Sequence, residues 1–365
     1  MSTTTSTDFR ITRTSTPRSD AERAELLASP RFGTVFTDHM ARMTWTSQDG
    51  WSNRRVEPYG PLQIDPAASV LHYGQEIFEG LKAYRHEDGS VWTFRPEANA
   101  ARFALSARRL ALPELSTEDF LGAITALVEV DEAWVPQGEE KSLYLRPFTY
   151  ASEVFLGVRS ALEAEFLVIA SPVGPYFASG VRPVSIWVAQ DYHRAGPGGT
   201  GQAKCGGNYA ASLLPQQEAY DAGCEQVCFL DAATNTLLEE LGGMNVFVVL
   251  ADGRVTTPEL TGTILEGVTR SSIIRLLLDA GHEVTERPIP LAELLGGLAD
   301  GSVAEVFACG TAAVVTPVGR LKGADFDVTV GAGDIGSVTS RVRAELTDIQ
   351  YGRATDRHGW MHRLV

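Results

Sequence analysis

Apolar positions along this chain repeat with two different periods, which predicts that strands and helices are mixed. Short apolar runs separated by turn residues predict strands over residues 32–95. A helix is expected to begin at Pro96, a second to follow a capping sequence at 116–119, and a third to run through 273–278 and end at Gly281. Further strands are expected at 143–146, 165–170, 184–190, 226–230, 244–250, 303–308 and 313–318. Because these elements do not alternate as regular βαβ units, we predict an α+β fold.

A change in composition marks a boundary near the middle of the chain. Residues 171–180 are rich in proline, glycine and aromatic side chains. A chain of 365 residues also favours two domains over one. The expected organisation is a disordered tail over 1–30, a small N-terminal α/β domain over 31–173, an interdomain loop over 174–180 and a larger domain over 181–365.

The composition is that of an ordinary soluble globular protein. The hydrophobic content is 44%, the charged content is 21%, and no apolar run approaches the length of a transmembrane helix. The net charge of −15 argues against nucleic acid as the main partner. The N-terminal residues lack the apolar stretch of a secretory signal, so we expect a cytoplasmic location. The scattered cysteines, at 205, 224, 228 and 309, are expected to be free, buried thiols.

One lysine lies within a run of small residues that has no evident use in a core. Lys204 is surrounded by the glycines of residues 198–207, which remove bulk from around its amine. An amine that attacks a carbonyl carbon needs low crowding, and burial can lower its pKa. A phosphate-binding P-loop is excluded, because Ala203 and Cys205 stand where that motif has glycine and then serine or threonine. Two interpretations stay open, a reactive amine and a flexible surface loop.

Three other segments have the chemistry of a binding site, and each also has a plainer interpretation. Residues 264–269 lead into a helix whose first N–H groups can bind phosphate, or they are a glycine-softened helix entry. Residues 309–312 follow a buried strand and can bind an anion through N–H groups and a hydroxyl, or form a simple turn. The adjacent Glu239 and Glu240 are either a solvated pair or the source of one carboxylate beside a cationic ring nitrogen.

A tyrosine and an arginine add a possible carboxylate-binding pair. Strand alternation puts Tyr144 and Arg146 on one face, which suits carboxylate recognition, with an exposed sheet face as the alternative. The histidines form no metal-binding pattern, so we expect no metal centre. A reactive lysine, an anion site and a counter-charge for a ring nitrogen are together what pyridoxal phosphate requires. The sequence therefore predicts this cofactor.

Longer motifs occur along the chain in a definite order. They are residues 32–40 (FGTVFTDHM), 71–84 (LHYGQEIFEGLKAY), Arg95-Pro96 with Asn99 and Arg102, 144–147 (YLRP), 204–210 (KCGGNYA), 239–245 (EELGGMN) and 310–312 (GTA). In these motifs and their order the chain resembles branched-chain amino-acid aminotransferases, pyridoxal-phosphate enzymes of fold type IV, from about Phe32 to the C-terminus. The resemblance implies a two-domain fold with the cofactor between the domains, a cofactor-binding role for the larger domain, and a homodimer.

The resemblance also implies roles for residues at matching positions. Lys204 would bind the cofactor aldehyde covalently and later move a proton. Tyr209 would hydrogen-bond the ring oxygen of the cofactor, and Glu240 would face its ring nitrogen. The phosphate-binding residues would be Arg102, Val268, Thr269 and Thr311. The substrate-binding residues would be Tyr73, Phe78, Tyr144, Arg146, Tyr176, Thr311 and Ala312.

The implied reaction is reversible transamination of leucine, isoleucine and valine with 2-oxoglutarate, of the kind used in branched-chain amino-acid biosynthesis. One apolar pocket would accept all three side chains, because a methylene there is worth only about 1–3 kcal/mol. D-amino-acid transaminases and aminodeoxychorismate lyases share the scaffold but are typically shorter and lack the segment at 32–40. A cofactor-binding protein without turnover is a further alternative, against which the intact set of Lys204, Tyr209 and Glu240 argues.

Two positions depart from the family pattern. Gly243 stands where some relatives have threonine, so a hydroxyl contact would be missing there. Residues 313–316 contain no cysteine, whereas some relatives have a Cys-x-x-Cys pair after Gly-Thr-Ala. We therefore predict no thiol switch at that loop.

Overall fold

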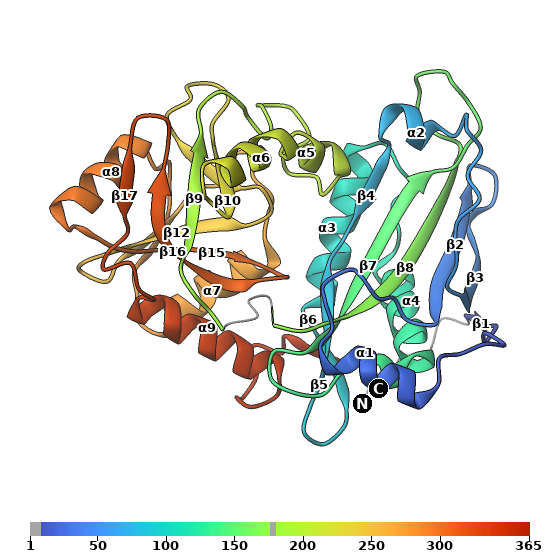
Figure 1. The fold of residues 1–365 in the computed structure, drawn as a ribbon. Coiled ribbons are helices and arrows are strands. Elements are labelled where there is room, and N and C mark those ends of the chain that lie inside the picture. The colour runs from blue at the N-terminus through green and yellow to red at the C-terminus, as the bar shows by residue number, and fades with distance from the viewer. Residues whose placement is uncertain (1–8, 176–179) are drawn as a thin grey trace. The chain divides into compact units, whose positions relative to one another are not determined.

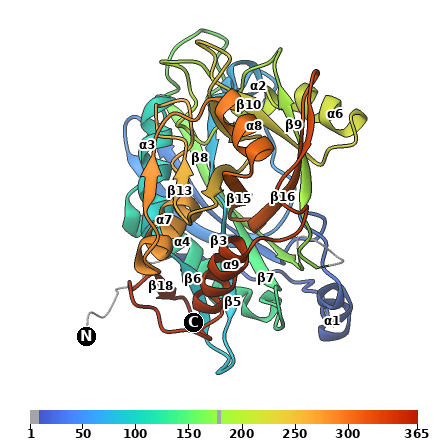
Figure 2. The ribbon, with the colours of Figure 1, turned by 90° about the vertical axis from the view of Figure 1, so that its left-hand side faces the viewer.

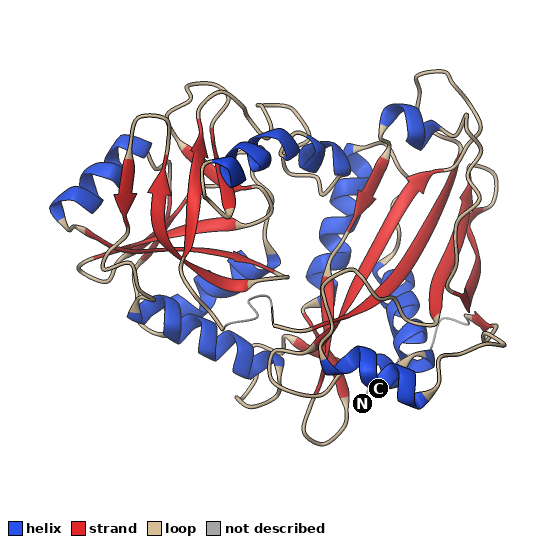
Figure 3. Cartoon of the chain, in the orientation of Figure 1, coloured by secondary structure: helices blue, strands red, loops and turns tan. Residues whose placement is uncertain are grey.

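The computed structural model describes residues 9–175 and 180–365, which form two compact units, each with its own nine-stranded sheet (Figures 1 and 3). Of these residues, the first unit contains 9–175, 203–206 and 349–365, and the second contains 180–202 and 207–348. Helix and strand are mixed in both units, as predicted. The domain limits differ from the expected 31–173 and 181–365, because the stretch around Lys204 and the C-terminal end group with the first unit. Part of the expected interdomain loop, 176–179, lies outside the described residues.

The first unit has a largely antiparallel sheet in the order β1-β3-β2-β8-β7-β5-β6-β18, with β4 beside β7. Its strands are β1 (Arg10–Ile11), β2 (His39–Thr46), β3 (Gly50–Pro58), β4 (Glu76–Phe78), β5 (Leu81–Arg85), β6 (Val91–Phe94), β7 (Ser142–Ala151), β8 (Glu163–Val173) and β18 (Met361–Arg363). Its helices are α1 (Asp20–Ala28), α2 (Ser69–Tyr73), α3 (Pro96–Arg109) and α4 (Thr117–Val130), with a 3₁₀ turn at Glu132–Trp134.

Helices α3 and α4 begin where the sequence predicts and build the core of the first unit. Pro96 occupies the first turn of α3, where a missing N–H is tolerated. The Ser116 hydroxyl accepts the Asp119 N–H at 3.0 Å and caps α4. Phe103 of α3 packs against Phe120 of α4 and Phe166 of β8, with ring centroids 5.4 and 5.7 Å away. The buried faces of both helices therefore lie against the sheet.

The second unit has a sheet in the order β11-β10-β9-β16-β15-β12-β13-β14, with β17 beside β16. Its strands are β9 (Val184–Ala189), β10 (Gln226–Leu230), β11 (Leu238–Leu241), β12 (Asn245–Leu250), β13 (Val255–Thr257), β14 (Val284–Glu286), β15 (Val303–Gly310), β16 (Val314–Lys322) and β17 (Asp327–Thr329). Its helices are α5 (Gly206–Ala210), α6 (Leu213–Asp221), α7 (Val268–Asp279), α8 (Leu291–Asp300) and α9 (Ser337–Gln350). Helices α7 and α8 pack against β15 and are seen in front in Figure 2.

The expectation of a disordered tail over 1–30 is wrong for its described part, because residues 9–30 include β1 and α1. Ser19 and Glu22 form a reciprocal capping box at the start of α1. At the other end, the Lys141 ammonium donates to the carbonyls of Leu27 and Ala28 at 3.0 and 2.9 Å. The helix is therefore held at both ends, and one of the partners lies more than a hundred residues away in sequence.

Helix α9 was not predicted, although the sequence contained a signal for it. Val338, Val342 and Leu346 are buried at i,i+4 spacing on one face. The first turn of the helix is capped by a side chain of β15. Glu305 accepts the N–H groups of Val338 and Thr339 at 3.0 and 2.9 Å. None of the helices in the described ranges is long and apolar enough to cross a bilayer.

Candidate active site

Lys204 is fixed in the first unit by its own main chain. Its N–H donates to the Ser106 hydroxyl at 2.9 Å, and its carbonyl accepts the Phe78 N–H at 2.9 Å. The neighbours Ala203 and Cys205 are each 2% exposed and belong to the core of the first unit. The alternative of a flexible surface loop is therefore wrong at this position.

Gly206, two residues after Lys204, allows the main chain to pack closely against Glu76. The Gly206 N–H donates to the Glu76 carboxylate, and a Cβ at Gly206 would collide with that carboxylate. Burial raises the pKa of Glu76, while the hydrogen bond from Gly206 and the charge of Arg146 oppose that rise. Since Glu76 begins β4, the contact ties the lysine segment to the edge of the sheet.

A cluster of cationic and aromatic side chains surrounds the lysine. The Lys204 Nζ lies 4.8 Å from the ring centroid of Phe78, and the Arg146 guanidinium lies 4.7 Å from the same centroid. Arg146 also donates to the Tyr144 hydroxyl at 3.0 Å. The Arg146 Nε is buried and has no hydrogen-bond partner among the described residues. These four residues form what we call the lysine cluster, which combines two cationic side chains with two aromatic rings.

The position of Tyr144 depends on a glycine. A Cβ at Gly80 would overlap the Tyr144 hydroxyl, so only glycine leaves room for it. Phe32 packs its ring against that of Tyr144 at 4.9 Å between centroids, in an edge-to-face arrangement. Tyr144 is 9% exposed, so the alternative of an exposed sheet face is wrong for this residue.

Arg102, the expected phosphate ligand of α3, makes a buried ion pair. Its guanidinium donates to both carboxylate oxygens of Glu79, at 2.7 and 2.9 Å, and Asn99 donates to the same carboxylate at 2.8 Å. Burial by itself raises the pKa of Glu79. The charge and hydrogen bonds of Arg102, the charge of Lys204 and the Asn99 amide together lower the pKa below its ordinary value. The sequence motifs contained Glu79, but nothing in their spacing assigned it a role.

Replacing Glu79 with glutamine is expected to destabilise the fold by about 3 kcal/mol, because it leaves a buried guanidinium without its counter-charge. Since the pKa of Glu79 is lowered in the folded state, the stabilisation from ionised Glu79 is present above the unfolded-state pKa. It is lost as the pH falls through the lower folded-state pKa. Urea unfolding of wild type and variant at neutral and acidic pH measures both effects, and the difference between the two proteins should shrink in acid.

A matched control lies on the same helix. Arg108 of α3 makes the same two-bond contact with Glu114, at 2.9 and 2.8 Å, but both side chains are exposed. Glu114→Gln should change the unfolding transition little, because solvent screens an exposed pair. Equal losses in Glu79→Gln and Glu114→Gln would contradict a special role for the buried pair.

In the second unit, Glu240 of β11 is held by an arginine that sequence reasoning missed. Glu240 Oε1 accepts the Arg194 Nε at 3.0 Å and the Leu265 N–H at 2.8 Å, and Arg194 makes a second contact with the same oxygen. Arg194 also donates to the Gly201 carbonyl at 2.9 Å, within the glycine run before the lysine. The carboxylate is therefore paired with a buried cation.

The two glutamates of β11 differ in their contacts. Glu239 accepts a hydrogen bond from the Thr263 hydroxyl, whereas Glu240 contacts Arg194 and Leu265. Successive side chains of a strand point to opposite faces, so the two carboxylates face different surroundings. Both residues are buried, at 5% and 3% exposure, and the alternative of a solvated pair is wrong.

The expected anion-binding segments of the second unit lie side by side. Asn245 pairs with Cys309 across β12 and β15, which brings the motif at 243–245 beside 309–312. The Asn245 amide donates to the Leu265 carbonyl at 3.1 Å, and a Cβ at Gly267 would collide with the Asn245 side chain. Gly267 is the N-cap residue of α7 and provides no side-chain cap for the first turn, which begins with Val268 and Thr269.

Tyr209 joins this group from α5. A Cβ at Gly243, where some relatives have threonine, would lie 3.8 Å from the Tyr209 ring. Tyr209, the residue before α7 and the end of β15 thus each adjoin residues 243–245 of the second unit. An anion bound in this region could interact with the first N–H groups of α7, with the Thr311 hydroxyl and with the dipole of α7.

Two expected substrate residues are not placed with the lysine cluster. Tyr73 is 42% exposed at the end of α2, and its hydroxyl donates to the Leu156 carbonyl. Tyr176 lies outside the described residues.

All four cysteines are buried and unbridged. Burial raises the pKa of Cys228 to about 12 and raises that of Cys309 further, which disfavours the reactive thiolate. The absence of a thiol switch at 313–316 remains a prediction.

A family model that matches the middle of the chain defines the class of protein. Residues 76–321 match the family model of amino-transferase class IV. The chain is also 56% identical over 350 residues to a probable branched-chain-amino-acid aminotransferase of Streptomyces coelicolor, with 96% of each chain covered. It is 53% identical over 361 residues to a branched-chain-amino-acid aminotransferase of Mycolicibacterium smegmatis, with 98% of each covered.

Solved structures agree with these relatives. The fold is similar to that of the Escherichia coli branched-chain amino acid aminotransferase, with a TM-score of 0.74 and 28% identity over 89% of this chain and 100% of that one. It is similar to the T.th. branched-chain amino acid aminotransferase with pyridoxamine 5'-phosphate, with a TM-score of 0.72 and 29% identity over 89% and 99%. The chain therefore belongs to the branched-chain-amino-acid aminotransferase family of class IV. It is an enzyme of the transaminase type, and the family resemblance in its motifs is confirmed.

Proposed function

We propose that the chain catalyses reversible, ping-pong amino transfer between leucine, isoleucine or valine and 2-oxoglutarate, with pyridoxal 5'-phosphate as cofactor. The products would be branched-chain 2-oxo acids and L-glutamate. The lysine cluster carries this proposal, because Lys204, Phe78, Arg146 and Tyr144 combine an amine, an apolar ring and a carboxylate-binding pair. The printed names of the relatives support the substrate class.

The residues present fit this cofactor. A cationic ring nitrogen requires a carboxylate as its partner. Glu240 is a buried carboxylate, and Arg194 holds it in place. The start of α7 has no side-chain cap at Gly267 and suits a phosphate. A structural relative is named as a complex with the related pyridoxamine 5'-phosphate. When bound, the cofactor supplies a carbonyl that carries the amino group and a ring that accepts the electrons released at the substrate Cα.

Each protein residue then has a defined task. The Lys204 amine would hold the cofactor and afterwards move the proton at the substrate Cα, since its main chain is anchored on both sides. Glu240 would keep the ring nitrogen protonated, and Tyr209 would donate to the ring oxygen. The residues assigned to the phosphate are Arg102, Val268, Thr269 and Thr311. The residues assigned to the substrate are Tyr73, Phe78, Tyr144, Arg146, Tyr176, Thr311 and Ala312.

Arg146 is expected to distinguish the two substrates. Its guanidinium and the Lys204 amine both lie over the Phe78 ring, so Arg146 would pair with the second carboxylate of 2-oxoglutarate. Arg146→Gln should raise the KM for 2-oxoglutarate about tenfold or more, the effect of one lost charge-assisted hydrogen bond. The KM for 4-methyl-2-oxopentanoate, which has one carboxylate, should change much less. Steady-state kinetics with both oxo acids measure the difference.

Arg159 offers a matched control. It also stands over an aromatic ring, that of Phe155 at 4.2 Å, but it is exposed and paired with Glu153. Arg159→Gln should leave both KM values near those of the wild type. Equal changes for the two oxo acids in Arg146→Gln would contradict the role given to this arginine.

Two measurements on the purified protein test the proposed reaction directly. An absorbance spectrum should show the band of bound cofactor, and L-leucine should change that band. With 2-oxoglutarate as acceptor, L-leucine should give glutamate much faster than D-alanine. A preference for D-alanine, or pyruvate release from aminodeoxychorismate, would contradict the proposal. The homodimer and the cytoplasmic location remain predictions of the family resemblance and the sequence.

A further inference from the structure

The turn between β15 and β16 ends at a valine in an unusual backbone conformation. Gly310 pairs with Val314 across the two strands, and residues 311–313 form the turn between them. Val314 has a φ of 61°, which lies in the left-handed region. Among the non-glycine residues with positive φ in the described ranges, it is the only β-branched one, and such residues rarely adopt this conformation. A hairpin that needs a left-handed residue normally has glycine there.

Arg343 of α9 contacts the main chain on both sides of this valine. Its Nη1 donates to the carbonyls of Ala313 and Val315, at 3.2 and 3.0 Å. The pairing of β9 with β16 begins at Val318, so Arg343 contacts the stretch of chain that precedes this pairing. The two hydrogen bonds fix the carbonyls that flank Val314 and therefore restrain its dihedral angles. A guanidinium suits this task, because its N–H groups are rigidly arranged and charged.

Helix α9 provides a firm support for Arg343. Its first turn is bound to β15, because Glu305 accepts the N–H groups of Val338 and Thr339 at 3.0 and 2.9 Å. Val342, which precedes Arg343 in sequence, is buried. Since β15 itself leads into the turn, the strand, the turn and the helix form a closed frame. Arg343 closes this frame at the turn, and Glu305 closes it at the start of α9.

The same turn carries two residues that the proposed function assigns to the substrate, Thr311 and Ala312. Its first part is tightly packed, because a Cβ at Gly310 would lie 3.2 Å from the Met244 Cγ and 3.3 Å from the Gly243 carbonyl oxygen. N–H groups stabilise an anion most when their directions are fixed before the anion arrives. A turn that relaxed at its far end would lose those directions.

We propose that Arg343 is a positioning residue, which holds Val314 in the left-handed conformation and thereby fixes the turn at 311–312. The N–H groups of the turn would then meet a substrate carboxylate in a prearranged geometry. The carboxylate as ligand rests on the proposed function, whereas the restraint of Val314 rests on the contacts within the second unit. Arg343 acts through the turn and is assigned no contact with the substrate.

Amide hydrogen exchange of the peptide that contains residues 311–314 tests the restraint in the purified enzyme. Arg343→Gln should speed its exchange about tenfold or more, because Val314 leaves the strained region once the flanking carbonyls are released. Glycine adopts the left-handed conformation without that strain. In a Val314→Gly background, Arg343→Gln should therefore speed the exchange by less than about threefold.

The same four proteins should differ in their kinetics. Arg343→Gln should raise the KM values for L-leucine and 2-oxoglutarate about tenfold, because both substrates carry the carboxylate that the turn would hold, and should change kcat less. Adding Val314→Gly should restore most of both KM values. A merely structural role of Arg343 would not give this rescue, because glycine replaces none of its hydrogen bonds.

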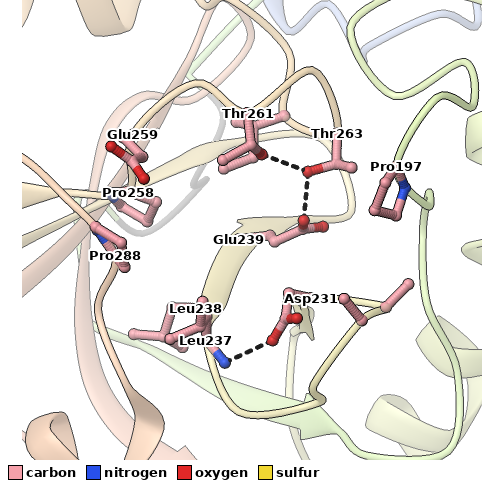
Figure 4. Close-up of a pocket in the computed structure, with 13 residues that line it drawn as sticks. Pro197, Asp231, Leu237, Leu238, Glu239, Pro258, Glu259, Thr261, Thr263 and Pro288 are labelled. Carbon is pink, nitrogen blue, oxygen red and sulfur yellow. Dashed lines mark hydrogen bonds between the residues drawn. The ribbon is translucent and has the colours of Figure 1, made fainter.

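Two controls separate a local effect from a general one. Arg341 lies on the same helix but is exposed, and it contacts His282 at 3.3 Å, so Arg341→Gln should change neither exchange nor KM. Residues 259–263 belong to the same unit and line a cavity beside β11, where the Thr261 and Thr263 hydroxyls are 2.8 Å apart (Figure 4). Their exchange should stay unchanged in Arg343→Gln, and equal acceleration in both peptides would contradict a local restraint.

Arg343→Lys covers the case in which Arg343→Gln does not fold. It keeps the positive charge but lacks the planar fork, so its effects should have the same direction and be smaller. The proposal fails if exchange at 311–314 is unchanged in the Arg343 variants, if Val314→Gly does not reduce their effect, or if exchange rises while KM stays constant. Exchange is read without substrates, so a wild type without transaminase activity would contradict the proposed function and leave the restraint to be judged by exchange.

Discussion

Replacing Lys204 with alanine is expected to abolish transamination while leaving the chain folded. The loss should be at least about 10⁴-fold, the upper end of what a positioned proton-transfer group contributes. The fold should survive because the hydrogen bonds of this residue with Ser106 and Phe78 are made by its main chain. The variant should also lack the visible absorption that a covalently held cofactor would give the wild type. Steady-state assays with L-leucine, absorbance and thermal unfolding measure the three effects.

The small number of lysines makes this test sharp. The sequence contains lysine at 82, 141, 204 and 322. Borohydride should fix the cofactor to one peptide, and mass mapping should place the label at 204. Lys141→Ala is the matched control, because that ammonium holds the carbonyls at the end of α1. Full turnover in Lys204→Ala, or a label on another lysine, would remove the basis of the proposed function.

Glu240→Gln is expected to have the second largest effect, and a much larger one than Glu239→Gln. Removing one preorganised electrostatic partner from an active site costs on the order of 10²-fold in turnover. The substitution keeps the shape of the side chain beside Arg194 and Leu265 but removes the charge that would hold a ring nitrogen protonated. Glu239 contacts Thr263 on the other side of β11, so its replacement should cost less than about tenfold.

Turnover and cofactor affinity should be measured together for both variants. Loss of affinity without loss of turnover at saturating cofactor would assign Glu240 to binding alone. Equal losses in the two variants would mean that the wrong carboxylate had been assigned to the ring nitrogen. Thermal unfolding separates these outcomes from a general loss of structure, because Arg194 is itself buried and loses its counter-charge in Glu240→Gln.

Local pattern was enough to predict most of the elements that hold the site. The start of α3 at Pro96 and the hydroxyl cap of α4 at Ser116 use residues adjacent in sequence, so they were predicted correctly. Alternation along β7 put Tyr144 and Arg146 on one face, and their hydrogen bond confirms that placement. These features depend on interactions within a few residues, and a sequence displays such interactions directly.

Features that depend on distant partners were missed or predicted wrongly. Helix α1 was expected to be disordered because the start of the chain is rich in serine and threonine. Its capping box of Ser19 and Glu22 is local and was overlooked, whereas its contact with Lys141 crosses more than a hundred residues. The cap of α9 comes from Glu305 on another element. The ion pair of Glu79 with Arg102 and that of Glu240 with Arg194 each join separate elements, and no spacing rule relates their members.

The sequence by itself determined the chemistry available to this protein: one lysine among small residues, adjacent glutamates, a tyrosine and arginine on one face, and the motifs of a class IV aminotransferase. These features could be predicted because residue types and their local spacing are read directly from the sequence. Only the tertiary structure decided which cation faces Glu79 and which faces Glu240, and that Glu239 contacts Thr263. Those choices depend on burial and on contacts between distant segments, which arise only when the chain has folded.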